Sequence, residues 1–350
     1  MKWMRPFARP KTARVTSSAT PLDGIDLVLA DLDGVVYRGP DAIPYAVDAL
    51  NAAAGAHRVG YLTNNASRTA ASVAEHLSSL GLTVAAEEVV TSPQAAMRVM
   101  QTLVPAGSTI LVIGGAGLVD EVEKAGFAVT RSALDEPAAV VQGFSPELGW
   151  VHLAEAAFAL QASKGDAGIP WVATNTDWTI PQARGTAPGN GTLVSAVHTA
   201  VGRLPVVAGK PEVPMFEVAT ERFAASSTLV IGDRLDTDIL GANRAGLSSV
   251  LVLTGIDQAK QVLAADKDQR PTFILDDLRQ LSEPYPETVE TTDGTAVLTT
   301  VGDATVRREG ENLTVVAPGS PINRLRAGCA AIWNSGVAIY GLRVAPELYS

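Results

Sequence analysis

Residues 25–36 read Ile-Asp-Leu-Val-Leu-Ala-Asp-Leu-Asp-Gly-Val-Val, an apolar run that ends in two carboxylates and a glycine. The run 25–30 predicts a strand buried on both faces, as in a parallel sheet. Asp31 and Asp33 stand at its carboxyl end, and Gly34 indicates that the chain turns there. Open α/β sheets bind ligands at the carboxyl ends of their strands. This stretch therefore predicts an α/β protein with a site at Asp31 and Asp33.

Short apolar runs alternate with helical segments along most of the chain, which is typical of βα units around a parallel sheet. One set of units has expected strands at 25–30, 58–63, 206–208, 228–231 and 249–253. A second set lies inside the first, with expected strands at 109–113, 138–142 and 171–173 and expected helices near 118–125, 153–162 and 193–201. We therefore expect a doubly wound, Rossmann-like core from residues 21–84 and 206–282, interrupted by an α/β cap domain at 85–205.

The sequence changes character after a proline-containing linker at 282–286. Asp293-Gly294, between Thr- and Val-rich runs, predicts a hairpin, and Gly310 indicates a second turn. The pair Ser320-Pro321 predicts the start of a helix that ends at Gly336. Its apolar face would carry Ile322, Leu325, Cys329 and Ile332, and Val337–Tyr340 would form a last strand. Residues 287–350 are thus expected to form a small α+β appendage.

The composition excludes several classes of protein. The chain has 350 residues, 27 Lys and Arg against 37 Asp and Glu, a net charge of −10 and one cysteine. Such an acidic chain is poorly suited to bind nucleic acid or an anionic membrane. A single cysteine allows no internal disulfide, which is typical of a reducing compartment. We therefore expect a soluble cytoplasmic protein. Residues 1–20 carry five basic side chains and no acidic one, and predict a disordered leader.

Three further polar clusters follow predicted core strands. They are Thr63-Asn64-Asn65, Gly209-Lys210-Pro211, and Gly232-Asp233 with Asp236 and Asp238 downstream. Because the carboxyl ends of parallel strands meet at one edge of a sheet, we expect all four clusters to lie together.

This set of side chains suits phosphoryl transfer. A carboxylate such as Asp31 can attack phosphorus and form a covalent aspartyl phosphate. Several acids at one site need a cation, and Mg²⁺ prefers hard oxygen ligands. Lys210 would offset the negative charge and Thr63 would donate to a phosphate oxygen. Asp33 would protonate the leaving alkoxide and later activate water.

The ordered clusters Asp31-Leu-Asp33-Gly-Val-Val, Thr63, Lys210 and Gly232-Asp233-x-x-x-x-Asp238 resemble the four motifs of the haloacid dehalogenase-like hydrolases. The resemblance covers about residues 22–285. Asp-Gly-Val after the first acid and Thr-Asn-Asn at the second motif are similar to the 4-nitrophenylphosphatase-like branch, as is the large cap between the second and third motifs.

The resemblance implies a role for each matching residue. Asp31 would be the nucleophile and a metal ligand, and Asp33 the general acid/base with its main-chain carbonyl on the metal. Asp233 would complete the Mg²⁺ site, and Asp238 would hold a metal-bound water. Thr63 and Lys210 would bind the phosphoryl group.

Two further groups of residues come from the same branch. Asn64 and Asn65 match motif-two positions that contact phosphate or substrate. The cap stretch with Asn175, Thr176 and Asp177 also resembles the branch, and we expect these residues to form a cap loop near the site.

The branch includes phosphatases for several small metabolites. We expect a phosphomonoester phosphatase, with glycerol 3-phosphate as the favoured substrate and phosphoglycolate, pyridoxal phosphate or a nucleoside monophosphate as alternatives. A second hypothesis is a regulatory or binding protein governed by the appendage. The sequence leaves a homo-oligomer open. The stretch Gly114-Gly115-Ala116-Gly117 follows a strand but lacks the spacing of a dinucleotide-binding loop, which favours a plain turn at a helix start.

Overall fold

The computed structural model describes residues 19–161, 168–182 and 184–349, so the predicted leader lies outside the described residues except for Ala19 and Thr20. The chain divides into two compact units. Of the described residues, the first unit contains 19–38, 42–58 and 227–349, and the second contains 39–41, 59–161, 168–182 and 184–226. In the part of the chain that the structure describes, no helix has the length and apolarity needed to cross a bilayer.

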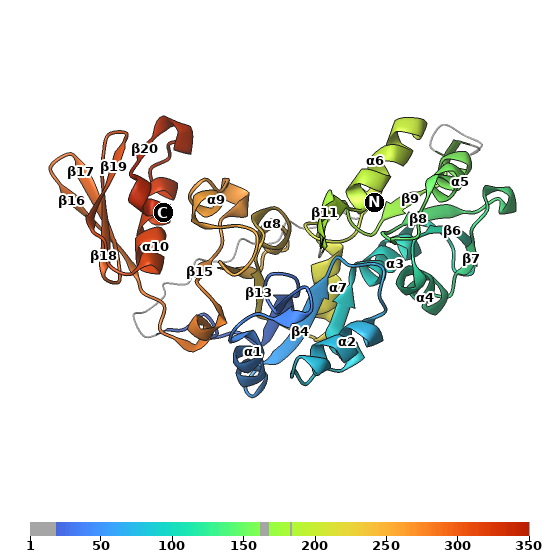
Figure 1. Cartoon of the computed structure of the whole chain (residues 1–350), viewed down its shortest axis with the longest axis horizontal. Helices are drawn as coiled ribbons and strands as arrows, with labels where there is room; N and C mark the ends of the chain where they lie inside the picture. Colours follow the sequence, from blue (N-terminus) through green and yellow to red (C-terminus); the bar gives the residue numbers. More distant parts are fainter. Residues whose placement is uncertain (1–18, 162–167, 183, 350) are drawn as a thin grey trace. The chain divides into compact units, whose positions relative to one another are not determined.

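Four parallel strands form the centre of the first unit (Figure 1). They lie in the order β15 (Phe273–Leu275), β14 (Ser248–Val252), β13 (Thr228–Gly232) and β1 (Leu27–Asp31). Its helices include α1 (Ala46–Ala54), α8 (Leu240–Arg244) and α9 (Ala259–Leu263). The residues Leu27 to Ala30 are all 0% exposed, because strands of a covered parallel sheet are buried on both faces. The short strands β2 (Tyr37–Arg38) and β3 (Asp41–Ala42) follow β1.

The second unit holds a parallel pair of strands and a separate five-stranded parallel sheet. The pair is β4 (Arg58–Thr63) and β5 (Val89–Thr91). The sheet has the order β12 (Val206–Val207), β9 (Trp171–Ala173), β8 (Ala139–Gln142), β6 (Thr109–Ile113) and β7 (Ala128–Thr130). The helices are α2 (Ala70–Ser79), α3 (Ser92–Leu103), α4 (Ala116–Lys124), α5 (Trp150–Gln161), α6 (Asn190–Val201) and α7 (Pro214–Arg222).

Helices cover the five-stranded sheet on both sides: Figure 1 shows α5 and α6 above it and α4 below. Side chains alternate across a strand, so Leu111 and Ile113 of β6 share one face. They pack in one apolar cluster with Leu160 of α5 and Val194 of α6. This layering confirms the predicted inserted α/β segment as a covered parallel sheet.

Two features of this sheet differ from expectation. Residues 206–207 form a strand as predicted, but this strand, β12, pairs with β9 in the five-stranded sheet and not with the core strands. The antiparallel hairpin of β10 (Thr179–Gln182) and β11 (Gly185–Pro188) is absent from the sequence-based strands. Strand pairing depends on long-range partners, which a local apolar run does not specify.

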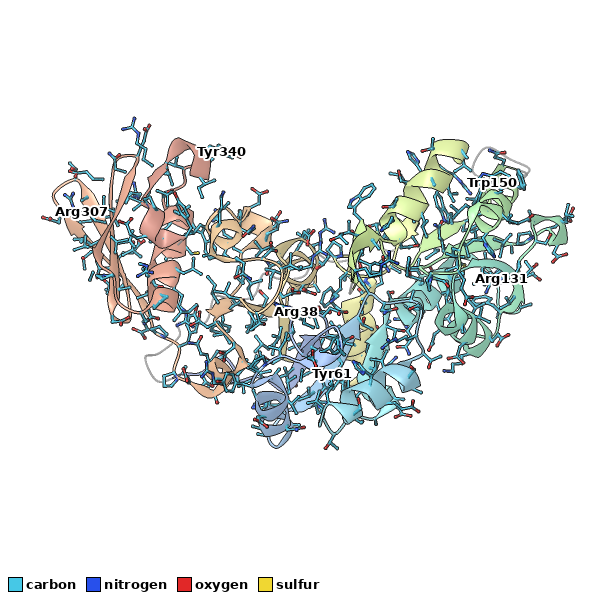
Figure 2. All side chains as sticks on the ribbon, in the orientation of Figure 1. Arg38, Tyr61, Arg131, Trp150, Arg307 and Tyr340 are labelled. Carbon is cyan, nitrogen blue, oxygen red and sulfur yellow. The ribbon has the colours of Figure 1, made fainter. Side chains whose placement is uncertain are left out.

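The C-terminal appendage is a mixed sheet with a helix on one face (Figure 1). Its elements are β16 (Thr288–Asp293), β17 (Ala296–Val301), β18 (Ala304–Glu309), β19 (Asn312–Ala317), α10 (Pro321–Trp333) and β20 (Arg343–Val344). The predicted last strand at 337–340 is wrong: β20 lies further on and pairs in parallel with β19. Tyr340 lies in the short helical turn before β20, where its side chain is 91% exposed and projects outward (Figure 2). An apolar residue near the end of the chain was therefore no sign of a buried strand.

The appendage shares its apolar core with the first unit. Ile322, Leu325 and Ile332 of α10 belong to one buried cluster with Ile239 and Leu263. Polar contacts add to this cluster, because Arg326 donates from Nε and Nη2 to the carbonyl oxygen of Ile274 at 2.9 and 2.7 Å. Its guanidinium also lies 4.4 Å from the centre of the Tyr285 ring. The appendage is therefore packed as part of the first unit.

Candidate active site

Three carboxylates gather at the carboxyl edge of the first unit's sheet. Asp31 is the last residue of β1, and Asp233 directly follows β13. These strands pair in parallel with Ala30 opposite Ile231, which brings the two acids to the same edge. One oxygen each from Asp31, Asp233 and Asp238 lies within 4.8 Å of the others. Such a set of close carboxylate oxygens fits a hard divalent cation.

Asp233 is held tightly in this cluster. It is 1% exposed, and its Oδ2 accepts a hydrogen bond from the Ile256 amide at 2.7 Å. Two glycines pack against the carboxylate: a Cβ at Gly255 would lie 1.9 Å from Oδ2, and one at Gly34 would lie 2.2 Å from it. Both positions therefore require glycine for the Asp233 carboxylate to keep its place.

Asp238 and the turn that carries it are also fixed. Asp238 is 1% exposed, and its Oδ2 accepts from the Arg234 amide at 3.2 Å. Asp257, which lies outside the carboxylate cluster, stabilises the same turn, because its Oδ2 accepts from the Leu235 amide at 2.6 Å. Burial, with the nearby Asp236 and Asp238 charges, raises the pKa of the Asp257 carboxyl, while the Leu235 amide opposes this shift. One Asp238 carboxylate oxygen lies within 4.8 Å of oxygens of Asp31 and Asp233, and its expected role in holding a metal-bound water stays a prediction.

The side chain of Asp33 is exposed and lies outside the carboxylate cluster. The chain turns directly after it, because Gly34 has φ +87° and its amide donates to the Tyr37 carbonyl at 2.9 Å. This turn follows the predicted reversal of the chain at Gly34. An accessible carboxyl group beside the cluster can exchange protons with a bound molecule.

Replacement of Gly255 by alanine is expected to weaken divalent-cation binding by roughly 10- to 100-fold, because the new methyl group would displace Asp233. Titration with Mn²⁺ followed by electron paramagnetic resonance measures this affinity without turnover. Gly149→Ala is the matched control, since a Cβ there would meet no atom within 4 Å. Equal cation affinity in both variants would contradict the packing argument.

A second group of predicted residues meets in the other unit, around Asn64. Asn64 follows β4, and its side chain pairs with the main chain of Lys210: Oδ1 accepts from the amide at 2.9 Å, and Nδ2 donates to the carbonyl at 3.0 Å. Lys210 is 3% exposed and Thr63 is also 3% exposed. A Cβ at Gly209 would lie 2.6 Å from Asn64 Oδ1, so the close approach needs glycine. The second and third motifs are thus joined through one amide side chain.

The cap loop 175–177 contacts the same amide. Asn64 Nδ2 lies 3.2 Å from both carboxylate oxygens of Asp177. Asn175 is 3% exposed and donates from Nδ2 to the Asn64 carbonyl at 2.7 Å. The Thr176 carbonyl packs where a Cβ on Gly191 would lie, at 2.3 Å. Asn65 is exposed, and among the described residues its side chain bonds only to Ser67, with Oδ1 accepting from the Ser67 amide and hydroxyl.

Replacement of Asn64 by alanine is expected to lower the free energy of unfolding by about 2 kcal/mol, because the Lys210 main chain loses both partners. Urea unfolding followed by circular dichroism measures the change. Asn65→Ala removes the same side chain from an exposed position and should cost less than about 1 kcal/mol. If the two variants lose stability equally, Asn64 does not join the motifs.

Sequence reasoning missed Gly255 and Asp257, although a signal was present. They follow β14 at the same sheet edge that carries the other clusters. It also missed Ser92, which is 0% exposed and donates to the Asn64 carbonyl at 2.7 Å. Ser92 begins a helix after β5, so no strand-end cluster pointed to it.

A parallel α/β sheet with clustered carboxylates at its carboxyl edge defines a class of cation-dependent enzymes. A family model described as haloacid dehalogenase-like hydrolase matches residues 28–128, and a HAD-hydrolase-like model matches residues 207–281. The chain belongs to the haloacid dehalogenase-like hydrolases. The predicted resemblance and the fold class, a doubly wound core with a cap, are confirmed.

Similar proteins are phosphatases. The chain is 41% identical over 316 residues to D-glycerol 3-phosphate phosphatase of Mycobacterium tuberculosis, covering 89% of this chain and 87% of that one. It is 35% identical to human chronophin, over 73% and 92% of the two chains. The crystal structure of the M. tuberculosis glycerol phosphate phosphatase with magnesium superposes with a TM-score of 0.81, 38% identity and coverage of 94% and 95%. The 4-nitrophenylphosphatase from Thermotoga maritima gives 0.68, 28%, 75% and 98%.

The likeness to these relatives extends over different parts of the chain, and only some of it can include the appendage. Residues 287–350 would remain unmatched if a relative ended with the core. A coverage of 94% of 350 residues extends beyond residue 286, so the likeness to the M. tuberculosis enzyme reaches into the appendage. The likeness to the T. maritima enzyme covers 75% of this chain, which is too little to include both the whole core with its cap and the whole appendage. The chain is thus a haloacid dehalogenase-like phosphatase whose likeness to the M. tuberculosis enzyme extends into the C-terminal appendage.

Proposed function

We propose that this protein is a Mg²⁺-dependent phosphatase that hydrolyses D-glycerol 3-phosphate to glycerol and inorganic phosphate. The observation that carries the activity is the cluster of Asp31, Asp233 and Asp238 oxygens at one sheet edge. The substrate is supported by the 41% identical M. tuberculosis enzyme, whose likeness includes the appendage.

The residues of the chain divide the chemical work. Asp31 Oδ attacks phosphorus, and the bond from phosphorus to the glycerol oxygen breaks. Asp33 gives its proton to that oxygen as it leaves. A water molecule then attacks the aspartyl phosphate while Asp33 takes its proton, which releases inorganic phosphate and restores Asp31.

Other residues hold the reacting groups. Asp31, Asp233 and the Asp33 carbonyl would hold Mg²⁺, with Asp238 near a water on it. The cation supplies charge neutralisation for the carboxylates and the phosphate oxygens. Thr63 and Lys210 would bind the phosphoryl group, and Asn64 keeps Lys210 in place through its two main-chain hydrogen bonds. Asn65 and the loop of Asn175, Thr176 and Asp177 would face the glycerol part of the substrate.

The remaining proposals concern context. The domain boundaries at residues 84, 205 and 286, a cytoplasmic location and a homo-oligomer stay predictions. The separate five-stranded sheet of residues 109–207 supports an inserted cap.

Phosphate release tests the proposal. The substrates are D-glycerol 3-phosphate, its L enantiomer, phosphoglycolate, pyridoxal phosphate and AMP, each with Mg²⁺ and with EDTA. We expect the highest kcat/KM for D-glycerol 3-phosphate and no release in EDTA. A kcat/KM at least tenfold higher for another ester corresponds to about 1.4 kcal/mol of transition-state binding. It would show that the protein is a phosphatase with a substrate other than D-glycerol 3-phosphate. Absence of release from every ester would overturn both.

A further inference from the structure

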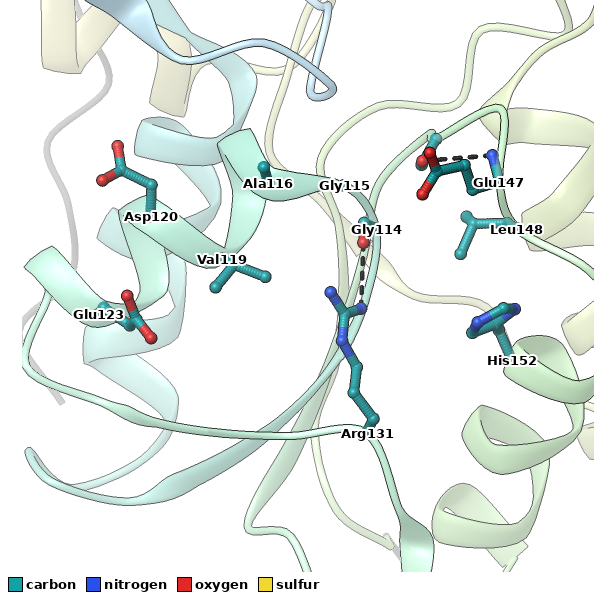
Figure 3. Close-up of a pocket in the computed structure, with 11 residues that line it drawn as sticks. Gly114, Gly115, Ala116, Val119, Asp120, Glu123, Arg131, Glu147, Leu148 and His152 are labelled. Atoms are coloured by element: carbon teal, nitrogen blue, oxygen red, sulfur yellow. Dashed lines mark hydrogen bonds between the residues drawn. The ribbon is translucent and has the colours of Figure 1, made fainter.

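The five-stranded sheet of the second unit has a pocket of its own, separate from the residues around Asn64. The chain leaves β6, forms β7 on one side of it, and then returns to form β8 on the other side. Loops that leave neighbouring strands in opposite directions open a crevice, and open α/β sheets bind ligands at such switch points. A pocket of about 560 Å³ lies there (Figure 3). Its size falls within the usual range of small-molecule sites.

Hydrogen-bond donors converge on this pocket from three loops. Gly114, Gly115 and Ala116 line it at the start of α4, where no side chain caps the helix. Arg131, after β7, is anchored through Nη1 to the carbonyl of Val112 and to that of Gly114, and Figure 3 shows the second of these bonds. No acceptor within the described residues is recorded for its Nη2 and Nε, which remain for a ligand. An anchored guanidinium beside a helix N-terminus matches a phosphate group.

Two further side chains add donors. Ser145 lines the pocket and is only 8% exposed. Its Oγ accepts from the Glu147 amide at 3.4 Å, and within the described ranges no acceptor for its hydroxyl proton is recorded. His152 Nδ1 accepts from the Gly149 amide at 3.1 Å, which places the proton of a neutral ring on Nε2. The nearly buried Ser145 hydroxyl accepts within its own turn and has its proton to donate to a ligand in the pocket.

The acidic side chains of the pocket lie on α4 and the loop after β8. Asp120 and Glu123 line it from α4, and Glu147 lines it from the loop. Asp120 is four residues beyond Ala116, or about 6 Å along the helix axis. Carboxylates at that distance accept from hydroxyl groups, and Val119 and Leu148 supply apolar walls. Glu147 lies beside Ser145 at the donor end (Figure 3), so the acceptor end consists of Glu123 and of Asp120, which also accepts from Lys124 Nζ at 2.6 Å. The two ends together fit one molecule that carries a phosphate and hydroxyl groups.

We propose that this pocket binds a hydroxylated organic phosphate, at a second site that is distinct from the catalytic one. The phosphate lies between Arg131, Ser145 and the start of α4, and its hydroxyl groups face Asp120 and Glu123. None of Thr63, Asn64, Asp177 and Lys210 lines the pocket. The glycine-rich stretch 114–117 thus opens a ligand pocket whose lining excludes the loops after β9 and β12, which carry residues 175–177 and Lys210.

Isothermal titration of the full chain with ribose 5-phosphate tests this site, with ribose as the arm that lacks phosphate. EDTA is present throughout, so cation-dependent turnover does not consume the probe. We expect one saturable site for ribose 5-phosphate and none for ribose. Arg131→Met should weaken binding by about tenfold or more. Lys210→Met removes the ammonium group proposed to bind phosphate at the catalytic site, and it should leave the affinity for ribose 5-phosphate unchanged.

Two further variants protect the result against misfolding. Gly115→Ala places a methyl group 3.5 Å from Ser145 Oγ without a clash, at ordinary φ and ψ, and should also weaken binding. Arg203→Met removes another arginine that donates to a carbonyl, that of Ile169, outside the pocket, and should not. Loss of binding in Lys210→Met with retention in Arg131→Met would assign the probe to the catalytic site. That result, or no saturable binding at all, overturns the proposal. Phosphate release by Arg131→Met, measured separately with Mg²⁺, reports on the proposed activity alone.

Discussion

Replacement of Asp31 by asparagine is expected to lower phosphate release from D-glycerol 3-phosphate by roughly 10⁴-fold or more, because an amide cannot form the aspartyl phosphate. Asp31 also supplies one oxygen to the three-carboxylate cluster. The variant should therefore lose both the nucleophile and part of the cation site. Phosphate release at saturating Mg²⁺ measures the loss, and thermal unfolding establishes that the variant is folded.

Asp236→Asn is the matched control for this change. Asp236 lies in the same turn as Asp238, but its carboxylate is exposed and paired with Arg234 at 2.8 Å. The same loss of one charge should leave turnover within about twofold, since exposed pairs contribute little. Removal of an enzyme's nucleophile lowers the rate by several orders of magnitude. Activity of Asp31→Asn above about one percent of the wild type would therefore show that another group attacks phosphorus.

Removal of the appendage by ending the chain at residue 286 is expected to leave the first unit unfolded or aggregated. The apolar cluster that α10 completes also includes five residues of the first unit before residue 286, which are Leu235, Ile239, Leu251, Leu263 and Ile274. Exposure of half of each such side chain costs on the order of 5 kcal/mol in all. This is comparable with the total stability of about 5–15 kcal/mol of a typical domain.

Point substitutions separate this loss from an effect of chain length. Leu325→Ala removes a 3% exposed side chain of α10 and should cost about 2–5 kcal/mol. Tyr340→Ala removes a 91% exposed one and should cost less than about 0.5 kcal/mol. Thermal unfolding and size-exclusion chromatography measure all three chains. A shortened chain that melts like the full one would support an independent appendage, and with it the regulatory hypothesis.

The sequence alone determined the elements whose signals are local. The predicted ranges of β4, β6 and β9 agree with the structure, because each is an apolar run bounded by turn residues. The clusters at strand ends could be found for the same reason. In a parallel sheet a polar group after a buried strand reaches the carboxyl edge, whichever strands are neighbours. Asp31 and Asp233 meet at the edge as this rule predicts.

Tertiary structure decided the features that depend on distant partners. It assigned β12 to the five-stranded sheet, placed the last strand at Arg343–Val344, and brought Gly255 against Asp233. It also joined Asn64 to Lys210, 146 residues away. A local pattern records whether a residue is buried and where the chain turns. It does not record which buried surface or which hydrogen-bond partner lies opposite, since that choice is made by packing of the whole chain.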